Sequence, residues 1–251
     1  MNTGTKINLL LQDIPPGVVL LSSWLCSKGY PYALQQRYRK SGWLTAIGKG
    51  AMKRSGDTVT LAGAIFSLQH QTGMMIHIGG RTAMGMQGLA HYIELYAKES
   101  LLFAPRGVKL PVWLQNNTWD TKPILINTAV LPPETGLTQF TEAGLEIQIS
   151  NPIRAIIECL EMVPDRFSME EAYELMEGLS FLNPAVVQSV LEQCNSVKVT
   201  RLFLFLANKA GHNWLEDIRA DKLNTGSGKR VISPNGTYIP EYQITVPKSM
   251  L

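Results

Sequence analysis

The chain has 251 residues, of which 45% are hydrophobic and 17% are charged, and its formal net charge is +3. This composition excludes a disordered, collagen-like or coiled-coil protein, and the length allows one large domain or two small ones. Three widely separated cysteines without a CxxC motif argue against a disulfide framework and a cysteine zinc site. No apolar run reaches the roughly 20 residues of a membrane span, and signal-peptide features are missing. We therefore expect a cytoplasmic protein without metal or cofactor.

Positive charge is concentrated near the N-terminus. Residues 1–80 carry eight of the 23 bases but only two of the 20 acids, and six of these eight bases fall between Arg37 and Arg54. A local positive field attracts polyanions and speeds their encounter, which favours a nucleic-acid partner. The same pattern also fits the solvated basic face of an ordinary domain.

Three short helices are predicted in the first 42 residues. Residues 5–13 have helical character and end before two prolines. A second helix is expected to start with a serine N-cap at Ser22 or Ser23 and to close at Gly29. The third follows almost at once, over residues 31–41, between a proline and a glycine. Two short helices joined by a glycine-containing turn predict a helix–turn–helix.

The third helix has the side chains of a recognition helix. Leu34 and Tyr38 are four residues apart and are expected to pack inward. The residues expected to face away from the core, or to flank that face, are Gln35, Gln36, Arg37, Arg39 and Lys40. Glutamine pairs with adenine through two hydrogen bonds, and arginine binds guanine or phosphate. A polar solvent face, which every surface helix has, is the alternative.

A β-hairpin is predicted directly after this helix. Residues 43–47 and 51–54 are short extended segments on either side of a Gly-Lys-Gly turn. A hairpin behind a helix–turn–helix is a candidate wing, which would place Lys49, Lys53 and Arg54 against phosphates or in the minor groove. The turn lacks the glycine spacing and the following serine or threonine of a phosphate-binding Walker motif.

The rest of the chain predicts a mixed α/β region. A helix is expected over residues 58–73 and another over residues 83–96. Strands then precede a run of helices, with a capping box at Ser168, and a terminal hairpin is expected at residues 234–236. The four histidines lack metal-ligand spacing, and no nucleophile motif occurs, so no catalytic residue is predicted. The fold class is α+β, with domains at residues 1–95 and 96–251.

Three motifs in the first 95 residues resemble the AbiEi antitoxins of type IV toxin–antitoxin systems. They are L-x-S-x-W-L-x-x-x-G from Leu20, R-Y-x-x-S-G-W-L leading into G-x-G-A-x-x-R from Arg37, and H-x-G-G-R-T-A-x-x-x-x-G from His77. The resemblance implies an N-terminal winged helix–turn–helix that binds inverted repeats in its own promoter and represses it. It also implies a C-terminal domain that opposes a nucleotidyltransferase toxin, with or without binding it.

Carried onto this sequence, the DNA-contacting residues would be Gln35, Gln36, Arg37, Arg39, Lys40, Lys49, Lys53 and Arg54. Arg81 fits the G-G-R-T motif, with either a functional or a structural role. Two alternatives stay open. Beside a DNA-binding antitoxin without enzymatic activity, the chain could be a nucleic-acid-processing enzyme with a basic targeting module. It could also be an adaptor whose helices after residue 151 bind the toxin directly.

Overall fold

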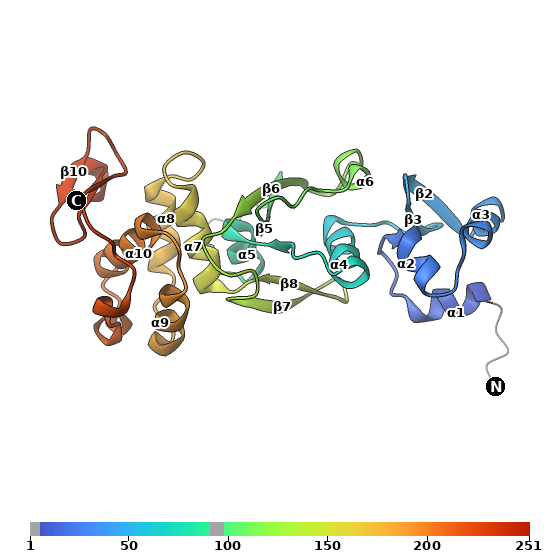
Figure 1. Cartoon of the computed structure of the whole chain (residues 1–251), viewed down its shortest axis with the longest axis horizontal. Coiled ribbons are helices and arrows are strands. Elements are labelled where there is room, and N and C mark those ends of the chain that lie inside the picture. The colour runs from blue at the N-terminus through green and yellow to red at the C-terminus, as the bar shows by residue number, and fades with distance from the viewer. Residues whose placement is uncertain (1–5, 91–97) are drawn as a thin grey trace. The chain divides into compact units, whose positions relative to one another are not determined.

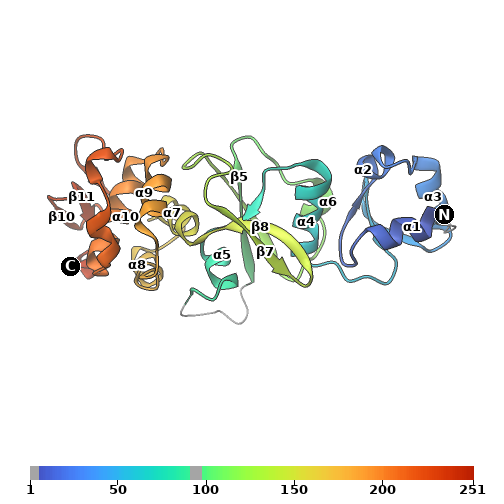
Figure 2. The same cartoon turned by 90° about the horizontal axis from the view of Figure 1, so that it is seen from below.

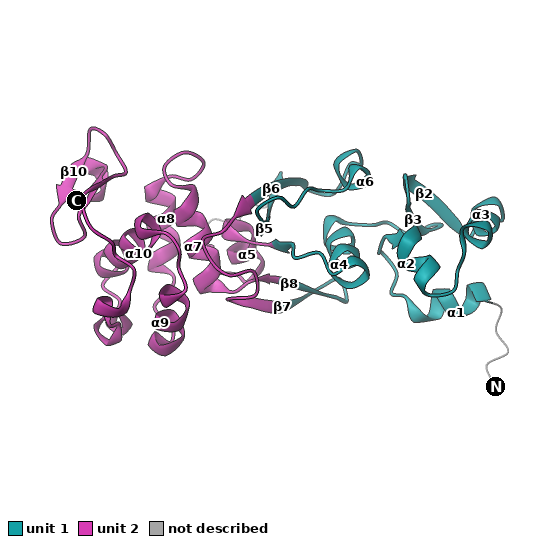
Figure 3. Ribbon diagram, viewed as in Figure 1, with its two compact units in different colours: residues 1–77, 98–126, 139–148 teal, residues 78–97, 127–138, 149–251 magenta. Residues whose placement is uncertain are grey.

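The computed structural model describes residues 6–90 and 98–251. Contacts between residues divide the chain into two compact units, which Figure 3 shows in different colours. Unit 1 contains residues 1–77, 98–126 and 139–148, and unit 2 contains residues 78–97, 127–138 and 149–251. Each unit is therefore assembled from segments that are distant in the sequence. Helices and strands are mixed in the α+β manner that the sequence predicts, whereas the domain boundary at residue 95 stays a prediction.

Unit 1 begins with a winged helix–turn–helix module (Figures 1 and 2). Its elements are, in chain order, α1 (Lys6–Asp13), β1 (Leu20–Leu21), α2 (Ser22–Ser27), α3 (Tyr32–Lys40), β2 (Leu44–Gly48) and β3 (Ala51–Arg54). The strands form an antiparallel sheet in the order β1-β3-β2, so β2 is an edge strand. Two helices joined by a short turn and followed by a hairpin give the module its name.

Local backbone preferences place the ends of these elements. Gly42 after α3 and Gly50 in the hairpin turn both have a φ of 74°, a conformation that glycine adopts without steric cost. The predicted serine cap of α2 is wrong, because Leu21 precedes the helix and no side chain caps it. Instead, the Ser22 N–H donates to the Gly50 carbonyl at 2.9 Å, which ties α2 to the hairpin.

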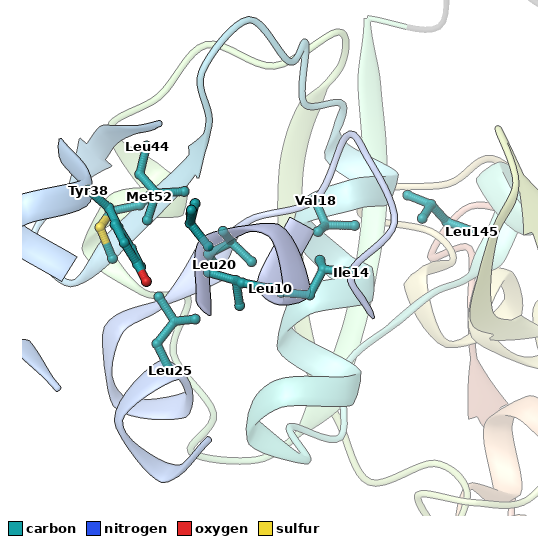
Figure 4. Packing of buried hydrophobic residues seen from close by; sticks show 10 residues of the cluster. Leu10, Ile14, Val18, Leu20, Leu25, Tyr38, Leu44, Met52 and Leu145 are labelled. Atoms are coloured by element: carbon teal, nitrogen blue, oxygen red, sulfur yellow. The ribbon is translucent and has the colours of Figure 1, made fainter. Parts of the chain in front are cut away.

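An apolar core joins the helices to the hairpin (Figure 4). Leu20, Leu25 and Leu44 are at most 2% exposed, and Tyr38 of α3 belongs to the same cluster. Complete burial of such a side chain stabilises the fold by about 1.5–3 kcal/mol. The core therefore holds one side of α3 and leaves its other side to solvent.

A five-stranded sheet has the order β6-β5-β4-β8-β7, in which β4 pairs with β8 in parallel. Its strands are β4 (His77–Ile78), β5 (Glu99–Pro105), β6 (Lys122–Thr128), β7 (Leu137–Glu142) and β8 (Leu145–Ser150). Unit 1 also contains α4 (Leu61–Thr72) and the single turn α6 (Val112–Gln115). The Thr60 side chain caps α4 by accepting a hydrogen bond from the Gly63 N–H, and Gly73 ends this helix in the left-handed conformation.

Unit 2 is mainly helical. Its helices are α5 (Gly80–Met86), α7 (Pro152–Met162), α8 (Met169–Glu177), α9 (Pro184–Glu192) and α10 (Val197–Lys209), followed by the 3-10 turns η1 (Asn213–Asp217), η2 (Ala220–Lys222) and η3 (Lys248–Met250). A small sheet in the order β10-β11-β9 contains β9 (Arg230–Val231), β10 (Thr237–Ile239) and β11 (Ile244–Val246). The predicted cap at Ser168 is confirmed, since its hydroxyl accepts from the Glu171 N–H at 3.0 Å.

Two predicted elements lie elsewhere. The terminal hairpin turns at residues 240–243, where the Gln243 N–H donates to the Pro240 carbonyl, and not at residues 234–236. The helix predicted over residues 83–96 starts earlier, at Gly80, and ends at Met86. The part of that prediction over residues 91–96 lies outside the described residues. Across the described ranges, no helix is long and apolar enough to cross a membrane.

Candidate nucleic-acid interface

The outer face of α3 carries amide and basic side chains. Gln36, Arg37, Arg39 and Lys40 are all exposed, as the sequence predicts for a recognition helix. Tyr38 is buried on the opposite side, in the apolar core. A helix held by its inner face on the hairpin can place its outer face in the major groove of duplex DNA. Contact of these four side chains with DNA stays a prediction.

Gln35 does not belong to this face, and its assignment as a DNA contact is corrected. The residue is only 2% exposed. Its Nε2 donates to the Tyr30 carbonyl at 2.7 Å, to the Ser22 carbonyl at 3.1 Å and to the Cys26 sulfur at 3.4 Å. A buried amide that satisfies backbone acceptors is unavailable to a base edge. Gln35 therefore fastens α3 to α2 and to the turn between them.

The wing presents only one of its three predicted bases freely. Lys49 is exposed in the hairpin turn. Lys53 is partly buried, and its Nζ donates to the Asp57 carbonyl at 2.6 Å. Arg54 is also partly buried, and its Nη2 donates to the carbonyls of Leu11 and Ile14 at 2.7 and 3.0 Å. Lys53 and Arg54 thus help to hold the module together, and their contact with DNA stays a prediction.

The electrostatics of the module favour a polyanion. No acidic residue occurs from residue 14 to residue 56, a stretch that contains seven bases. Within the described residues, none of the α3 bases makes an ion pair with a carboxylate. Within the described residues their charges are therefore not paired with carboxylates. Such a surface raises the local concentration of phosphate groups and releases counterions when it binds them.

Two further residues of α3 extend the candidate interface. Tyr32 is 66% exposed, and Ala33 is exposed beside it in the first turn of the helix. Recognition helices contact base edges mainly with their N-terminal residues, and alanine can contact the methyl group of thymine. The helical spacing of Ala33, Gln36 and Lys40 puts them on one stripe opposite the buried residues. This spacing is visible in the sequence, but a search for amides and bases overlooks a tyrosine and an alanine.

Two family models together match nearly the whole chain. A family model described as "Transcriptional regulator, AbiEi antitoxin, Type IV TA system" matches residues 97–247. A second, described as "Transcriptional regulator, AbiEi antitoxin N-terminal domain", matches residues 3–95. The chain belongs to the AbiEi family. It is accordingly a regulator and antitoxin of a type IV toxin–antitoxin system.

A solved structure has a similar fold over nearly the whole chain. It is the crystal structure of the RV2827C protein from Mycobacterium tuberculosis, with a TM-score of 0.58 and 13% sequence identity. The similarity covers 96% of this chain and 89% of that chain. At this identity the likeness concerns the fold alone. No curated protein matches the chain.

The H-x-G-G-R-T motif of this AbiEi chain has a structural explanation in unit 2. The Gly80 N–H, at the start of α5, donates to Glu158 Oε2 at 2.9 Å, and the Ser150 hydroxyl donates to the same oxygen at 2.7 Å. Glu158 Oε1 accepts from Arg154 Nε at 2.8 Å, and both of these side chains are almost completely buried. Arg81 of the motif forms an exposed ion pair with Glu171 at 3.6 Å.

Helix α7 of unit 2 carries a buried arginine and a buried thiol, Arg154 and Cys159. Nη1 of Arg154 donates to three backbone carbonyls of residues 132–135, so this arginine joins α7 to the segment before β7. Burial, followed by the charge of Glu158, raises the pKa of the Cys159 thiol, which keeps this thiol protonated. In the part of the chain that the structure describes, no three histidine, cysteine, aspartate or glutamate side chains are grouped to hold a metal ion.

Proposed function

We propose that this AbiEi antitoxin binds duplex DNA through the outer face of α3 and the tip of the wing. The DNA would be the inverted repeats of its own promoter, which it would repress. The observation that supports this most is the exposure of Gln36, Arg37, Arg39, Lys40 and Lys49 on a module without acidic residues from 14 to 56. In this arrangement α3 contacts base edges, and Lys49 contacts a backbone phosphate.

The test measures affinity for a labelled duplex that carries the promoter upstream of the chain's own reading frame. The Lys49→Ala variant should weaken binding to all duplexes alike and lower the slope of log affinity against log salt by about one, because one phosphate contact is lost. The Gln36→Ala and Arg39→Ala variants should instead weaken the preference for the promoter over a scrambled duplex, by roughly 1–3 kcal/mol for a base contact.

Lys222→Ala provides the matched control, because Lys222 is an exposed lysine of unit 2. Its removal changes the net charge by the same amount as Lys49→Ala, yet it should leave the affinity and the salt slope unaltered. If Arg39→Ala and Lys49→Ala both bind the promoter as the unmodified chain does, the proposed interface is wrong.

We further propose that residues 96–251 carry the antitoxin activity and oppose a nucleotidyltransferase toxin from the neighbouring reading frame. Membership of the AbiEi family supports this step. Co-expression of the chain with that toxin should restore growth, and the Arg39→Ala and Lys49→Ala variants should still restore it while losing repression. Loss of growth rescue in these variants would contradict the separation of the two activities.

Purification of the co-expressed proteins then separates two ways of opposing the toxin. A type IV antitoxin that acts on the effect of the toxin should leave the two chains in separate fractions on size exclusion. A stable complex would support the adaptor hypothesis instead, with the toxin bound directly.

A further inference from the structure

The wing is in contact with a segment from much later in the chain. Asn117 Nδ2 donates to the carbonyl of Ile47 in β2 at 2.7 Å, and the same amide nitrogen donates to the Trp113 carbonyl. Gly48 lies directly against Trp113, since a Cβ at Gly48 would be only 2.6 Å from the Trp113 Cβ. All of these residues belong to unit 1.

This contact lies where the strand pairing of the hairpin is irregular. Because β2 is an edge strand, it has a strand partner, β3, on one side only. The register between β2 and β3 shifts between Ala46 and Gly48, so the ladder is interrupted at Ile47. Such irregularities bend a strand and redirect it. Asn117 binds the carbonyl at this interruption, two residues before Lys49.

The segment that reaches the wing is itself firmly held. Trp113 is 6% exposed and Leu114 is fully buried. Trp119 Nε1 donates to the Leu114 carbonyl at 2.8 Å, and the ring of Trp119 meets that of Trp113 edge to face, with centroids 6.1 Å apart. Asp120 Oδ1 accepts from the Leu61 N–H at the start of α4 at 2.7 Å. Residues 113–120 therefore form a rigid support in contact with the wing.

We propose that Trp113 and Asn117 are positioning residues for DNA binding. They hold the wing at the angle at which Lys49 meets the DNA backbone, although neither needs to touch DNA itself. The inference rests on the proposed function, and it extends that function. Residues matched by the first family model, 97–247, would set the affinity of a module matched by the second, 3–95.

Two variants remove the support in different ways. Asn117→Ala deletes the hydrogen bond to Ile47, and Gly48→Ala forces the wing away from Trp113 without straining the backbone, because Gly48 does not have a positive φ. Each should weaken binding to the promoter duplex roughly threefold to tenfold, about the effect of one lost hydrogen bond. The matched controls are Asn116→Ala, at an exposed neighbour, and Gly85→Ala, where a Cβ meets nothing within 4 Å. Both controls should bind like the unmodified chain.

A double-mutant cycle with Lys49→Ala separates positioning from a loss of folded protein. If Asn117 positions the wing, Lys49→Ala should lower affinity by a smaller factor in the Asn117→Ala background than in the unmodified chain. Equal factors in the two backgrounds, with the melting temperature lowered by Asn117→Ala, would overturn the inference and leave a purely structural role. Unchanged affinity of Asn117→Ala would also overturn it, while the proposed function would stand. If the unmodified chain binds no promoter duplex, the proposed function itself fails.

Discussion

One pair of arginines from each unit of this protein shows two opposite environments. Arg37 and Arg39 on α3 are exposed, whereas Arg154 and Arg201 in unit 2 are at most 3% exposed. Arg201 donates to the carbonyls of Thr225, Gly228 and Gln243, as Arg154 does to those of the segment before β7. The comparison shows that the number of bases in a region does not determine how much positive charge that region exposes to solvent.

The difference has a physical cause in the surrounding backbone. Removing a guanidinium from water is costly unless its N–H groups find acceptors, and loops next to α7 and α10 supply several carbonyls. Burial lowers the pKa of Arg201, but an arginine keeps its charge at neutral pH, so the acceptors are needed. Among residues 6–90 and 98–251, no backbone carbonyl of a loop accepts a hydrogen bond from the bases of α3, and these bases are exposed.

The largest expected effect comes from breaking the buried pair of unit 2. Glu158→Ala leaves the Arg154 guanidinium buried without its carboxylate and removes the acceptor of the Gly80 N–H. We expect a loss of about 3–5 kcal/mol in the free energy of unfolding. Urea denaturation, followed by circular dichroism, measures this loss.

An exposed ion pair provides the control for this prediction. Glu99→Ala removes the partner of Lys122, at 3.2 Å on the surface of unit 1, and should cost less than about 1 kcal/mol. Similar losses for Glu158→Ala and Glu99→Ala would contradict the contrast between buried and displayed charge.

Two adjacent glutamines sharpen the comparison within one helix. Gln35→Ala should lower the free energy of unfolding by about 1–3 kcal/mol, because the partly buried carbonyls of Ser22 and Tyr30 lose this donor. Its affinity for DNA per folded molecule should stay unchanged. Gln36→Ala should lower the affinity for DNA. It should alter the free energy of unfolding by less than about 0.5 kcal/mol, because the position is exposed. Chemical denaturation and anisotropy titration of the same preparations give both quantities.

A smaller effect is expected at the base of the wing. Arg54→Ala removes two hydrogen bonds to the end of α1 and should cost about 1–2 kcal/mol of stability. The salt dependence of DNA binding should keep its slope, since the side chain is engaged within the module. A slope lowered as much as by Lys49→Ala would show that Arg54 contacts phosphate after all.

The smallest effect concerns reactivity alone. Cys159 and Cys194 are buried, and burial raises the pKa of both thiols, whereas Cys26 is partly exposed. A thiol reagent should therefore label only Cys26 in the folded protein and all three cysteines after unfolding. At about pH 9 an ordinary thiol is largely ionised, yet Cys159 and Cys194 should still not react with the reagent in the folded protein. Mass spectrometry of labelled peptides identifies the sites, and rapid labelling of Cys159 in the folded chain would contradict the prediction.

Much of the N-terminal module could be predicted from local signals. Glycines at the turns, the apolar spacing of Leu34 and Tyr38, and the Gly-Lys-Gly hairpin all act over a few residues. The candidate interface was harder to predict, because helical spacing alone does not say whether Gln35 or Gln36 lies under α2. Lys53 and Arg54 donate to backbone carbonyls at Asp57 and at the end of α1, and only folding brings these acceptors near them.

The sequence by itself determined the family, the α+β class, the winged helix–turn–helix and the concentration of positive charge, because motifs, turns and composition are properties of short stretches. Only the tertiary structure decided which bases are displayed and which are bound, that Glu158 caps α5 from 78 residues away, and that Asn117 supports the wing. Those outcomes depend on which backbone groups lie close in space. Packing between segments that are distant in the sequence decides which groups come close.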